Sequence, residues 1–274
     1  MCLNLGEVAV GILTGKTVLV TGIARADSIA FAVADRAMRE GADVALTVYP
    51  RDLASASDVI RSLPAKPAFV LPIDVTSEAD LATLEAELRT GLGHVDGALH
   101  GVAFAPAAAL DAVLDVPAAA VEIAFRTSVH SYAALAGVLK RLAPTSGASL
   151  VGLDFESGRA WPVYNWMGPC KAALRSLNQY LARDLGPDHI RANLVAAGPL
   201  LTRAAAGIPD FDRLLRIWAS TSPLRWDPCD PAPVADVVCV LFSDMARAIT
   251  GEVVHVDGGA HAMAGQRSDP ALDG

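Results

Sequence analysis

The sequence predicts an α/β fold, with one doubly wound sheet of seven mostly parallel strands and helices on both faces. The first observation is that short apolar runs typical of buried strands alternate with helix-like segments from Thr17 onward. The second is the composition, since 53% of the 274 residues are hydrophobic and only 5% are aromatic. Such content suits a large core on both faces of a parallel sheet. No segment resembles a linker, so we expect a single domain.

The strands are expected where β-branched and other apolar residues run together between turn signals. The run TVLVT, which starts at Thr17, is the first, and DVALTVY, which Pro50 ends, is the second. A ligand crevice is expected at the carboxyl ends of such strands. The expected strands are residues 17–21, 43–49, 69–73, 97–102, 149–153, 190–196 and 252–256.

The helices are expected between these strands. Gly41 ends the first helix, and Ser77 with Asp80 resembles a capping box at the start of another. The expected helices are residues 28–40, 51–61, 77–90, 118–142, 163–185 and 231–243, with a partly helical excursion at residues 203–222.

Charge and cysteine content argue against several classes of protein. The net charge is −8 and the basic residues are scattered, so nucleic acid is an unexpected partner. The four cysteines form no CxxC pair and have no histidine at ligand spacing, which argues against a metal site and fits a reduced, cytoplasmic protein. No uncharged apolar run reaches membrane-spanning length, and the first ten residues do not read as a signal peptide.

A turn that could bind a dinucleotide follows the first expected strand. Residues 21–30 read TGIARADSIA, with Gly22 as the only glycine, so this is not the usual glycine-rich fingerprint. Backbone N–H groups at the start of the next helix, together with the Ser28 hydroxyl, could hold a pyrophosphate. The alternative is an ordinary strand–helix loop in which Ser28 caps the helix.

The end of the second strand bears on the choice between NADH and NADPH. Asp43 is at about the right separation for a ribose-binding acid, but it opens the strand and so lies at the wrong end of the sheet. Tyr49 could pack on the adenine side, and Arg51 could pair with a 2′-phosphate or simply be solvated. The absence of a basic cluster favours NADH without excluding NADPH.

Two further strand ends carry candidate cofactor contacts. Asp74 and Val75 follow the third strand, where the carboxylate could accept from the adenine amino group; the alternative is a capping region for the next helix. The stretch HGVAFAP at residues 100–106 is rich in small residues, which let the backbone approach a ligand closely.

Tyr164 and Lys171 stand seven residues apart in a helix-like stretch. Two helical turns rise about 10.5 Å, so both side chains are expected on one helix face. A phenol and an ammonium beside a bound dinucleotide can stabilise an oxyanion that develops during hydride transfer. Taken singly, Tyr164 could equally be a rim tyrosine and Lys171 a solvated lysine.

These elements, in this order, resemble the enoyl-acyl-carrier-protein reductases of the short-chain dehydrogenase superfamily over residues 13–265. The Tyr-x6-Lys spacing and the Ser-Ile-Ala turn distinguish that family from carbonyl-reducing members, which carry Tyr-x3-Lys and a glycine-rich turn. The elements are the turn at 21–30, Asp74-Val75, residues 100–106, Asp154-Phe155, Tyr164 with Lys171, residues 197–202 and residues 256–259.

Parts of the sequence resemble different branches of this family. Residues 154–167 look most like the mycobacterial-type branch, whereas the segment after Thr202 is short, as in the general bacterial enzymes. In the family that segment, here residues 202–222, forms a lid over the acyl chain, so a less enclosed acyl groove is implied. Gly101 and Ala103 stand where the family usually has Ser and Gly, and Leu201 stands where Arg is common.

The resemblance implies a Rossmann-type domain that reduces trans-2-enoyl thioesters with NADH. Tyr164 would donate a hydrogen bond to the enolate oxygen, and Lys171 would bind the nicotinamide ribose and favour a more acidic Tyr164. The implied substrate contacts are Phe155, Ala105 and Met167. The implied cofactor contacts are Gly22, Ile23, Ser28, Ile29, Tyr49, Asp74, Val75, Gly101, Val102, Ala103, Lys171, Gly198, Pro199, Leu200 and Thr202.

The same resemblance implies an acyl-carrier-protein or CoA thioester as substrate and a homotetramer, with residues 256–259 near an interface and no membrane partner. Residues 1–12 are expected to precede the domain and residues 266–274 to form a polar tail. Two other hypotheses remain open at this point: a secondary-pathway reductase acting on another substrate, and a non-catalytic cofactor-binding protein.

Overall fold

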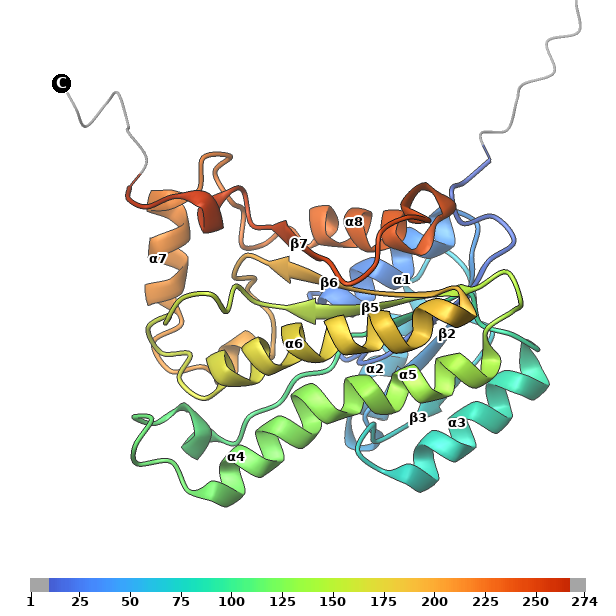
Figure 1. Ribbon diagram of the computed structural model, residues 1–274, viewed down its shortest axis with the longest axis horizontal. Coiled ribbons are helices and arrows are strands. Elements are labelled where there is room, and N and C mark those ends of the chain that lie inside the picture. Colours follow the sequence, from blue (N-terminus) through green and yellow to red (C-terminus); the bar gives the residue numbers. More distant parts are fainter. Residues whose placement is uncertain (1–9, 267–274) are drawn as a thin grey trace, which may run out of the picture.

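The computed structural model describes residues 10–266, which form one seven-stranded sheet (Figure 1). The strands are β1 Thr17–Val20, β2 Asp43–Val48, β3 Val70–Pro72, β4 Gly97–His100, β5 Ala148–Asp154, β6 Ile190–Ala197 and β7 Val253–Val256. Every pairing is parallel, and the order is β3-β2-β1-β4-β5-β6-β7. The predicted fold class, a doubly wound Rossmann-type sheet, is confirmed. Most of the expected N-terminal extension and of the expected tail lies outside the described residues.

Helices cover both faces of this sheet (Figure 1). They are α1 Ile29–Arg39, α2 Leu53–Arg61, α3 Glu78–Gly91, α4 Ala118–Phe125, α5 Ser131–Leu142, α6 Met167–Leu185, α7 Asp212–Thr221 and α8 Ala232–Phe242. One apolar layer joins α1, α2 and α8 to the sheet, and a second joins α3, α5 and α6 to it. Val18 and Val20 enter the first layer and Leu19 enters the second, because successive side chains of a strand point to opposite faces.

The helix expected over residues 118–142 is interrupted by a π-helical turn at Arg126–His130, between α4 and α5. Ser128 in this turn is fully buried, and its hydroxyl both accepts from the Phe104 N–H at 3.0 Å and donates to the Phe104 carbonyl at 3.1 Å. The π turn therefore ties the helix to the loop that follows β4. Apolar periodicity could not predict it, because the cause is a contact with a distant loop.

The helix expected over residues 163–185 begins at Met167 instead. Val163 and Asn165 have φ angles of 64° and 38°, in the left-handed region, which a right-handed helix cannot include. The Asn165 side chain donates to the Leu110 carbonyl at 2.5 Å, which fixes the turn against another loop. Tyr164 thus lies in a turn before α6, and the prediction that it shares a helix face with Lys171 is wrong.

The remaining expected elements are found close to their predicted bounds. The excursion at residues 203–222 is partly helical, with a 3-10 turn at Ala205–Gly207 followed by α7. Within residues 10–266, no helix is both long enough and apolar enough to cross a membrane. The same residues contain no group of histidine, cysteine and acidic side chains placed to hold a metal ion.

Replacing Tyr132 by Phe tests how the second apolar layer is held. Tyr132 on α5 is fully buried, and its hydroxyl donates to Oδ1 of Asn178 on α6 at 2.9 Å. We expect Tyr132→Phe to lower the free energy of unfolding by about 1–3 kcal/mol, because the buried amide oxygen loses its donor. Urea denaturation followed by circular dichroism measures this change.

The matched control is Tyr180→Phe, since Tyr180 lies on α6 with 56% of its surface exposed. This variant should change the free energy of unfolding by less than about 0.5 kcal/mol. Equal losses from the two variants would show that the buried hydrogen bond does not stabilise the layer.

Candidate active site

A cavity of about 720 Å³ lies at the carboxyl ends of the strands. Chain connections leave β1 and β4 in opposite directions, and doubly wound sheets bind ligands at such a point. The volume is within the range of cofactor and ligand sites. Every residue predicted for the site borders this one cavity: Gly22, Ile23, Ser28, Ile29, Tyr49, Asp74, Val75, Gly101, Val102, Ala103, Ala105, Phe155, Tyr164, Met167, Lys171, Gly198, Pro199, Leu200 and Thr202. Their individual roles remain predictions.

The floor of the cavity is formed where the loops after β1 and β4 approach each other. Gly22 has φ of 85°, and a Cβ on it would lie 2.4 Å from the Gly101 carbonyl oxygen. A Cβ on Gly101 would lie 2.5 Å from the Thr21 carbonyl oxygen. The Thr21 hydroxyl links the loops by donating to the Leu99 carbonyl at 2.8 Å and accepting from the Gly101 N–H at 3.1 Å. At Gly101, where the family usually has Ser, a side chain would therefore require the backbone of these loops to shift.

Ser28 occupies the N-cap of α1. Its Oγ accepts from the Phe31 N–H at 3.1 Å and its hydroxyl donates to the Arg25 carbonyl at 2.7 Å. The capping alternative from the sequence is thus confirmed, and the capped helix begins beside the cavity. A helix N-terminus carries partial positive charge and favours an anion, so capping and anion binding are compatible.

Asp74 and Tyr49 border the part of the cavity expected to receive adenosine. One carboxylate oxygen of Asp74 accepts from both the N–H and the hydroxyl of Thr76, at 2.9 and 2.8 Å, in the turn before α3. Tyr49 is 46% exposed, and the guanidinium of Arg51 lies 5.2 Å from its ring centroid. Tyr49 is therefore a partly exposed aromatic ring at this end of the cavity, with the Arg51 guanidinium over one of its faces.

Three arginines meet at this end of the cavity: Arg25, Arg51 and Arg203. Each has a carboxylate neighbour. Asp27 lies 3.5 Å from Arg25, and Asp52 lies 3.0 Å from Arg203 and 3.9 Å from Arg51. The fold therefore brings together three arginines from separate segments, which form no basic run in the sequence, and places each beside a carboxylate.

Tyr164 and Lys171 lie at the opposite end and are both buried, at 8% and 5% exposed. The Lys171 ammonium donates to the Leu153 carbonyl at 2.8 Å, so this residue is not a solvated helix lysine. Burial lowers the pKa of Lys171, against the opposing effects of Asp154 and Cys170. Burial also raises the pKa of Tyr164, and Asp154 and Cys170 add to the rise. The net shift of the Tyr164 pKa is therefore upward, and the acidifying effect expected from Lys171 stays a prediction.

An aromatic cluster covers this end of the cavity. The Phe155 ring lies 4.7 Å from the Tyr164 ring and 5.2 Å from the ring of Trp218, which belongs to α7 in the lid segment. Met167 and Leu214 belong to the same buried cluster. Phe155 and Met167 thus serve as packing residues and also line the cavity.

The segment after β6 forms another wall. The Trp226 indole donates to the Pro199 carbonyl at 2.8 Å, and a Cβ on Gly198 would lie 2.7 Å from that indole. The Thr202 hydroxyl oxygen accepts from the Ala205 N–H at 3.2 Å, which starts the 3-10 turn of the lid. Leu201, where the family often has Arg, is 47% exposed.

Comparison with known proteins gives the family. The profile described as Enoyl-(Acyl carrier protein) reductase matches residues 22–261. Proteins named enoyl-[acyl-carrier-protein] reductase [NADH] from Mycolicibacterium smegmatis and Mycobacterium avium are 40% and 39% identical, each over 91% of this chain and 97% of the relative. One from Escherichia coli is 36% identical over 91% of this chain and 95% of its own.

The chain belongs to the enoyl-acyl-carrier-protein reductase family.

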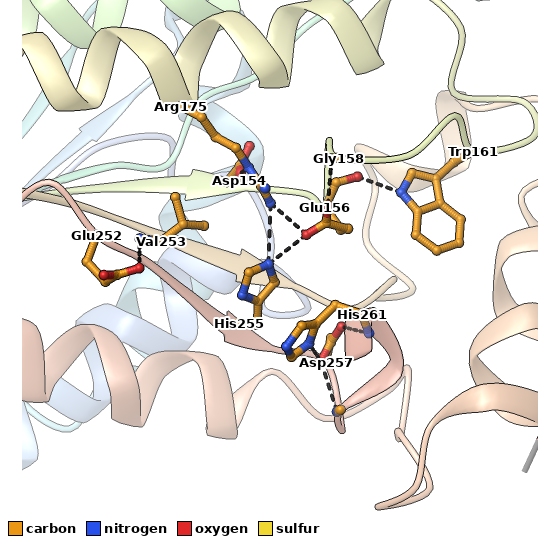
Figure 2. Close-up of polar contacts among 11 residues, drawn as sticks. Asp154, Glu156, Gly158, Trp161, Arg175, Glu252, Val253, His255, Asp257 and His261 are labelled. Carbon is orange, nitrogen blue, oxygen red and sulfur yellow. Dashed lines mark hydrogen bonds and ion pairs between the residues drawn. The ribbon is translucent and has the colours of Figure 1, made fainter. Parts of the chain in front are cut away.

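At the end of β5, this reductase carries a network of charged side chains that the sequence did not predict (Figure 2). Arg175 on α6 donates to Asp154 at 2.7 Å and to Glu156 at 2.9 Å, so it fixes the residues on both sides of Phe155. The Asp154 side chain is completely buried, and that of Glu156 is 11% exposed. Arg175 stands one helical turn after Lys171, and that spacing was the only signal available in the sequence.

Two histidines extend this network to the end of the sheet (Figure 2). The His255 imidazole on β7 lies 2.6 Å from the Glu156 carboxylate. Its ring stacks on that of His261 at 4.0 Å, and His261 in turn pairs with Asp257 at 2.9 Å. The interpretation of both histidines as structural residues fits these contacts. The network therefore joins β5, α6 and β7 behind the aromatic cluster.

Replacing Glu156 by Gln tests the contribution of this network. Burial opposes the charge of Glu156, but hydrogen bonds from Arg175 and His255 outweigh it and lower the pKa to about 2. Because the folded pKa is below the ordinary value of 4.5, the charge stabilises the fold above pH 4.5, and this stabilisation is lost as the pH falls toward 2. Glu156→Gln should lower Tm at neutral pH, and its difference from the wild type should narrow over that window.

Thermal unfolding followed by intrinsic fluorescence from pH 7 to pH 3 measures the difference. Glu87→Gln, an exposed carboxylate on α3, is the control and should leave Tm almost unchanged throughout. A difference for Glu156→Gln that stayed constant with pH would mean that the carboxylate charge is not what stabilises the network.

Proposed function

We propose that this reductase uses NADH to reduce trans-2-enoyl thioesters of acyl carrier protein, as in fatty acid biosynthesis. The observation that carries the proposal is that Tyr164 and Lys171 share one cavity with the turn after β1 and the start of α1. The names of the relatives from Mycolicibacterium smegmatis and Escherichia coli support both the substrate and the cofactor.

The residues around the cavity fit a dinucleotide. Gly22 and Gly101 leave no room for a Cβ, so backbone rather than side chain forms the floor. The N-terminus of α1 and Ser28 would hold the pyrophosphate, Tyr49 the adenine side, and Lys171 the nicotinamide ribose. The remaining cofactor contacts would be Ile23, Ile29, Asp74, Val75, Val102, Ala103, Gly198, Pro199, Leu200 and Thr202, all of which border the cavity. The bound nicotinamide supplies the hydride that is added to the β-carbon of the thioester.

Tyr164 stabilises the charge that develops as the thioester becomes an enolate. Its hydroxyl donates a hydrogen bond to the enolate oxygen and stays protonated, because burial raises its pKa. The α-carbon then takes a proton that comes ultimately from solvent. Phe155, Met167 and Ala105 border the space proposed for the acyl chain, and Leu214 of the lid helix α7 borders the same cavity.

The proposal also covers the bounds of the domain, its assembly and its cellular compartment. The domain spans residues 13–265 with its lid at 202–222, and the protein acts in the cytoplasm as a homotetramer, with residues 256–259 near an interface. Light scattering of the purified full chain tests the assembly. CoA thioesters are the alternative carriers, and comparing them with carrier-protein thioesters of equal chain length separates the two.

The reaction is tested by the loss of reduced-nicotinamide absorbance with a medium-chain trans-2-enoyl thioester. Turnover with this substrate and none with the matching β-ketoacyl thioester supports an enoyl reductase. Turnover with the ketoacyl substrate alone would contradict the proposal. Cofactor binding without turnover of either would favour a different substrate or the non-catalytic alternative.

Two variants separate the catalytic role of Tyr164 from the cofactor-binding role of Lys171. Tyr164→Phe should lower kcat by about 10²–10³-fold with little change in the Kd for NADH, because it removes a donor to the developing oxyanion. Lys171→Met should raise the Kd for NADH at least tenfold, because it removes a buried cation beside the nicotinamide ribose. Stopped-flow turnover and fluorescence titration measure the two constants.

Tyr180→Phe on the exposed side of α6 serves as the control and should retain wild-type constants. If Tyr164→Phe turned over at the wild-type rate, the phenol would have no part in catalysis.

A further inference from the structure

An ion pair between Asp52 and Arg203 borders the cavity at the end proposed for adenosine. Nη1 of Arg203 lies 3.0 Å from Oδ1 of Asp52, although the two residues come from the start of the lid and from the turn after β2. The Asp52 side chain is only 14% exposed, whereas that of Arg203 is 49% exposed. The pair therefore holds a largely shielded carboxylate at the cavity wall.

Asp52 still has an oxygen available for a ligand. The residue ends the 3-10 turn Pro50–Asp52, and Nε of Arg51 lies 3.9 Å from the same Oδ1 that Arg203 contacts. Within residues 10–266, Oδ2 of Asp52 makes no hydrogen bond to another residue. This geometry leaves one acceptor that could receive a hydroxyl group, on a carboxylate whose other oxygen lies near two guanidinium groups.

We propose that Asp52 is the residue that selects NADH over NADPH, and that it does so by occupying Arg51 and Arg203. This inference rests on the proposed use of a nicotinamide dinucleotide in this cavity. It deepens that proposal by assigning the choice of cofactor to Asp52, a carboxylate just beyond the carboxyl end of β2. Asp43 cannot have this role, because it lies at the opposite end of the strand.

The selection follows from charge. A 2′-phosphate carries about −1.5 to −2 charges, needs arginines for binding, and is repelled by a carboxylate that shares them. A ribose 2′-hydroxyl is neutral and can donate to a free carboxylate oxygen. Arg25 borders the same end but is paired with Asp27, so every guanidinium found there has a carboxylate neighbour. Removing the Asp52 charge would free two arginines for a phosphate.

The test is Asp52→Asn, which removes the charge and keeps the shape of the side chain. Titration of nicotinamide fluorescence gives the Kd of the full chain for NADH and for NADPH, without any thioester substrate. The wild type should bind NADH more tightly. In Asp52→Asn the ratio of the NADPH Kd to the NADH Kd should fall at least tenfold. Adding Arg203→Gln to Asp52→Asn should reverse most of that gain, because the phosphate then loses one of its two arginines.

The matched control is Asp58→Asn, the same change of charge on α2 at a side chain that is 83% exposed and does not border the cavity. It should leave the ratio unchanged. The inference is overturned if the wild type binds both cofactors equally, or if Asp52→Asn and Asp58→Asn shift the ratio alike. Because binding is measured without a thioester, failure of the enoyl-reduction assay would contradict the proposed reaction and leave this result standing.

Discussion

The site depends on the neighbouring strands β1 and β4, whose following segments lead to opposite faces of the sheet. The segment after β1 leads to α1 on one face of the sheet, and the segment after β4 leads toward α4 and α5 on the other. Two neighbouring strands whose connections part in this way leave a crevice at their carboxyl ends. The backbone contact between Gly22 and Gly101 closes the bottom of that crevice, and Thr21, which follows β1, holds the contact by two side-chain hydrogen bonds to the end of β4.

The sheet was predictable because each strand is a short apolar run between turn signals. The same rule explains why the residues predicted for the site border one cavity, since most of them directly follow a strand, and parallel strands bring such residues to one edge. The periodicity of apolar residues could not predict the turn that carries Tyr164. Left-handed φ angles at Val163 and Asn165 depend on the contact between Asn165 and Leu110, which are far apart in the sequence.

The position of Tyr164 shows that one prediction can be right for a wrong reason. The phenol and the Lys171 ammonium do border one cavity, but not because they share a helix face. Tyr164 is instead held by its contact with the Phe155 ring, at the end of β5. Likewise, Arg25, Arg51 and Arg203 form no basic run in the sequence, because only the folded chain brings their three segments together.

The two ends of the cavity handle charge in different ways. Near Asp52 the side chains of Arg203 and Arg51 are 49% and 68% exposed, so water and salt reach the ion pairs there. Near Lys171 the charges are buried, where an unbalanced charge is costly. There the cations Lys171 and Arg175 are matched by Asp154 and Glu156.

The buried imidazole of His100 does not disturb this balance of charges near Lys171. Burial and the charge of Lys171 lower the pKa of His100 to about 3, so it adds no third cation at neutral pH. The charges of these buried side chains balance, and Tyr164 is a neutral phenol whose pKa is raised by burial and by Asp154. A neutral hydrogen-bond donor adds no uncompensated buried charge at this end, which fits the oxyanion-stabilising role proposed for Tyr164.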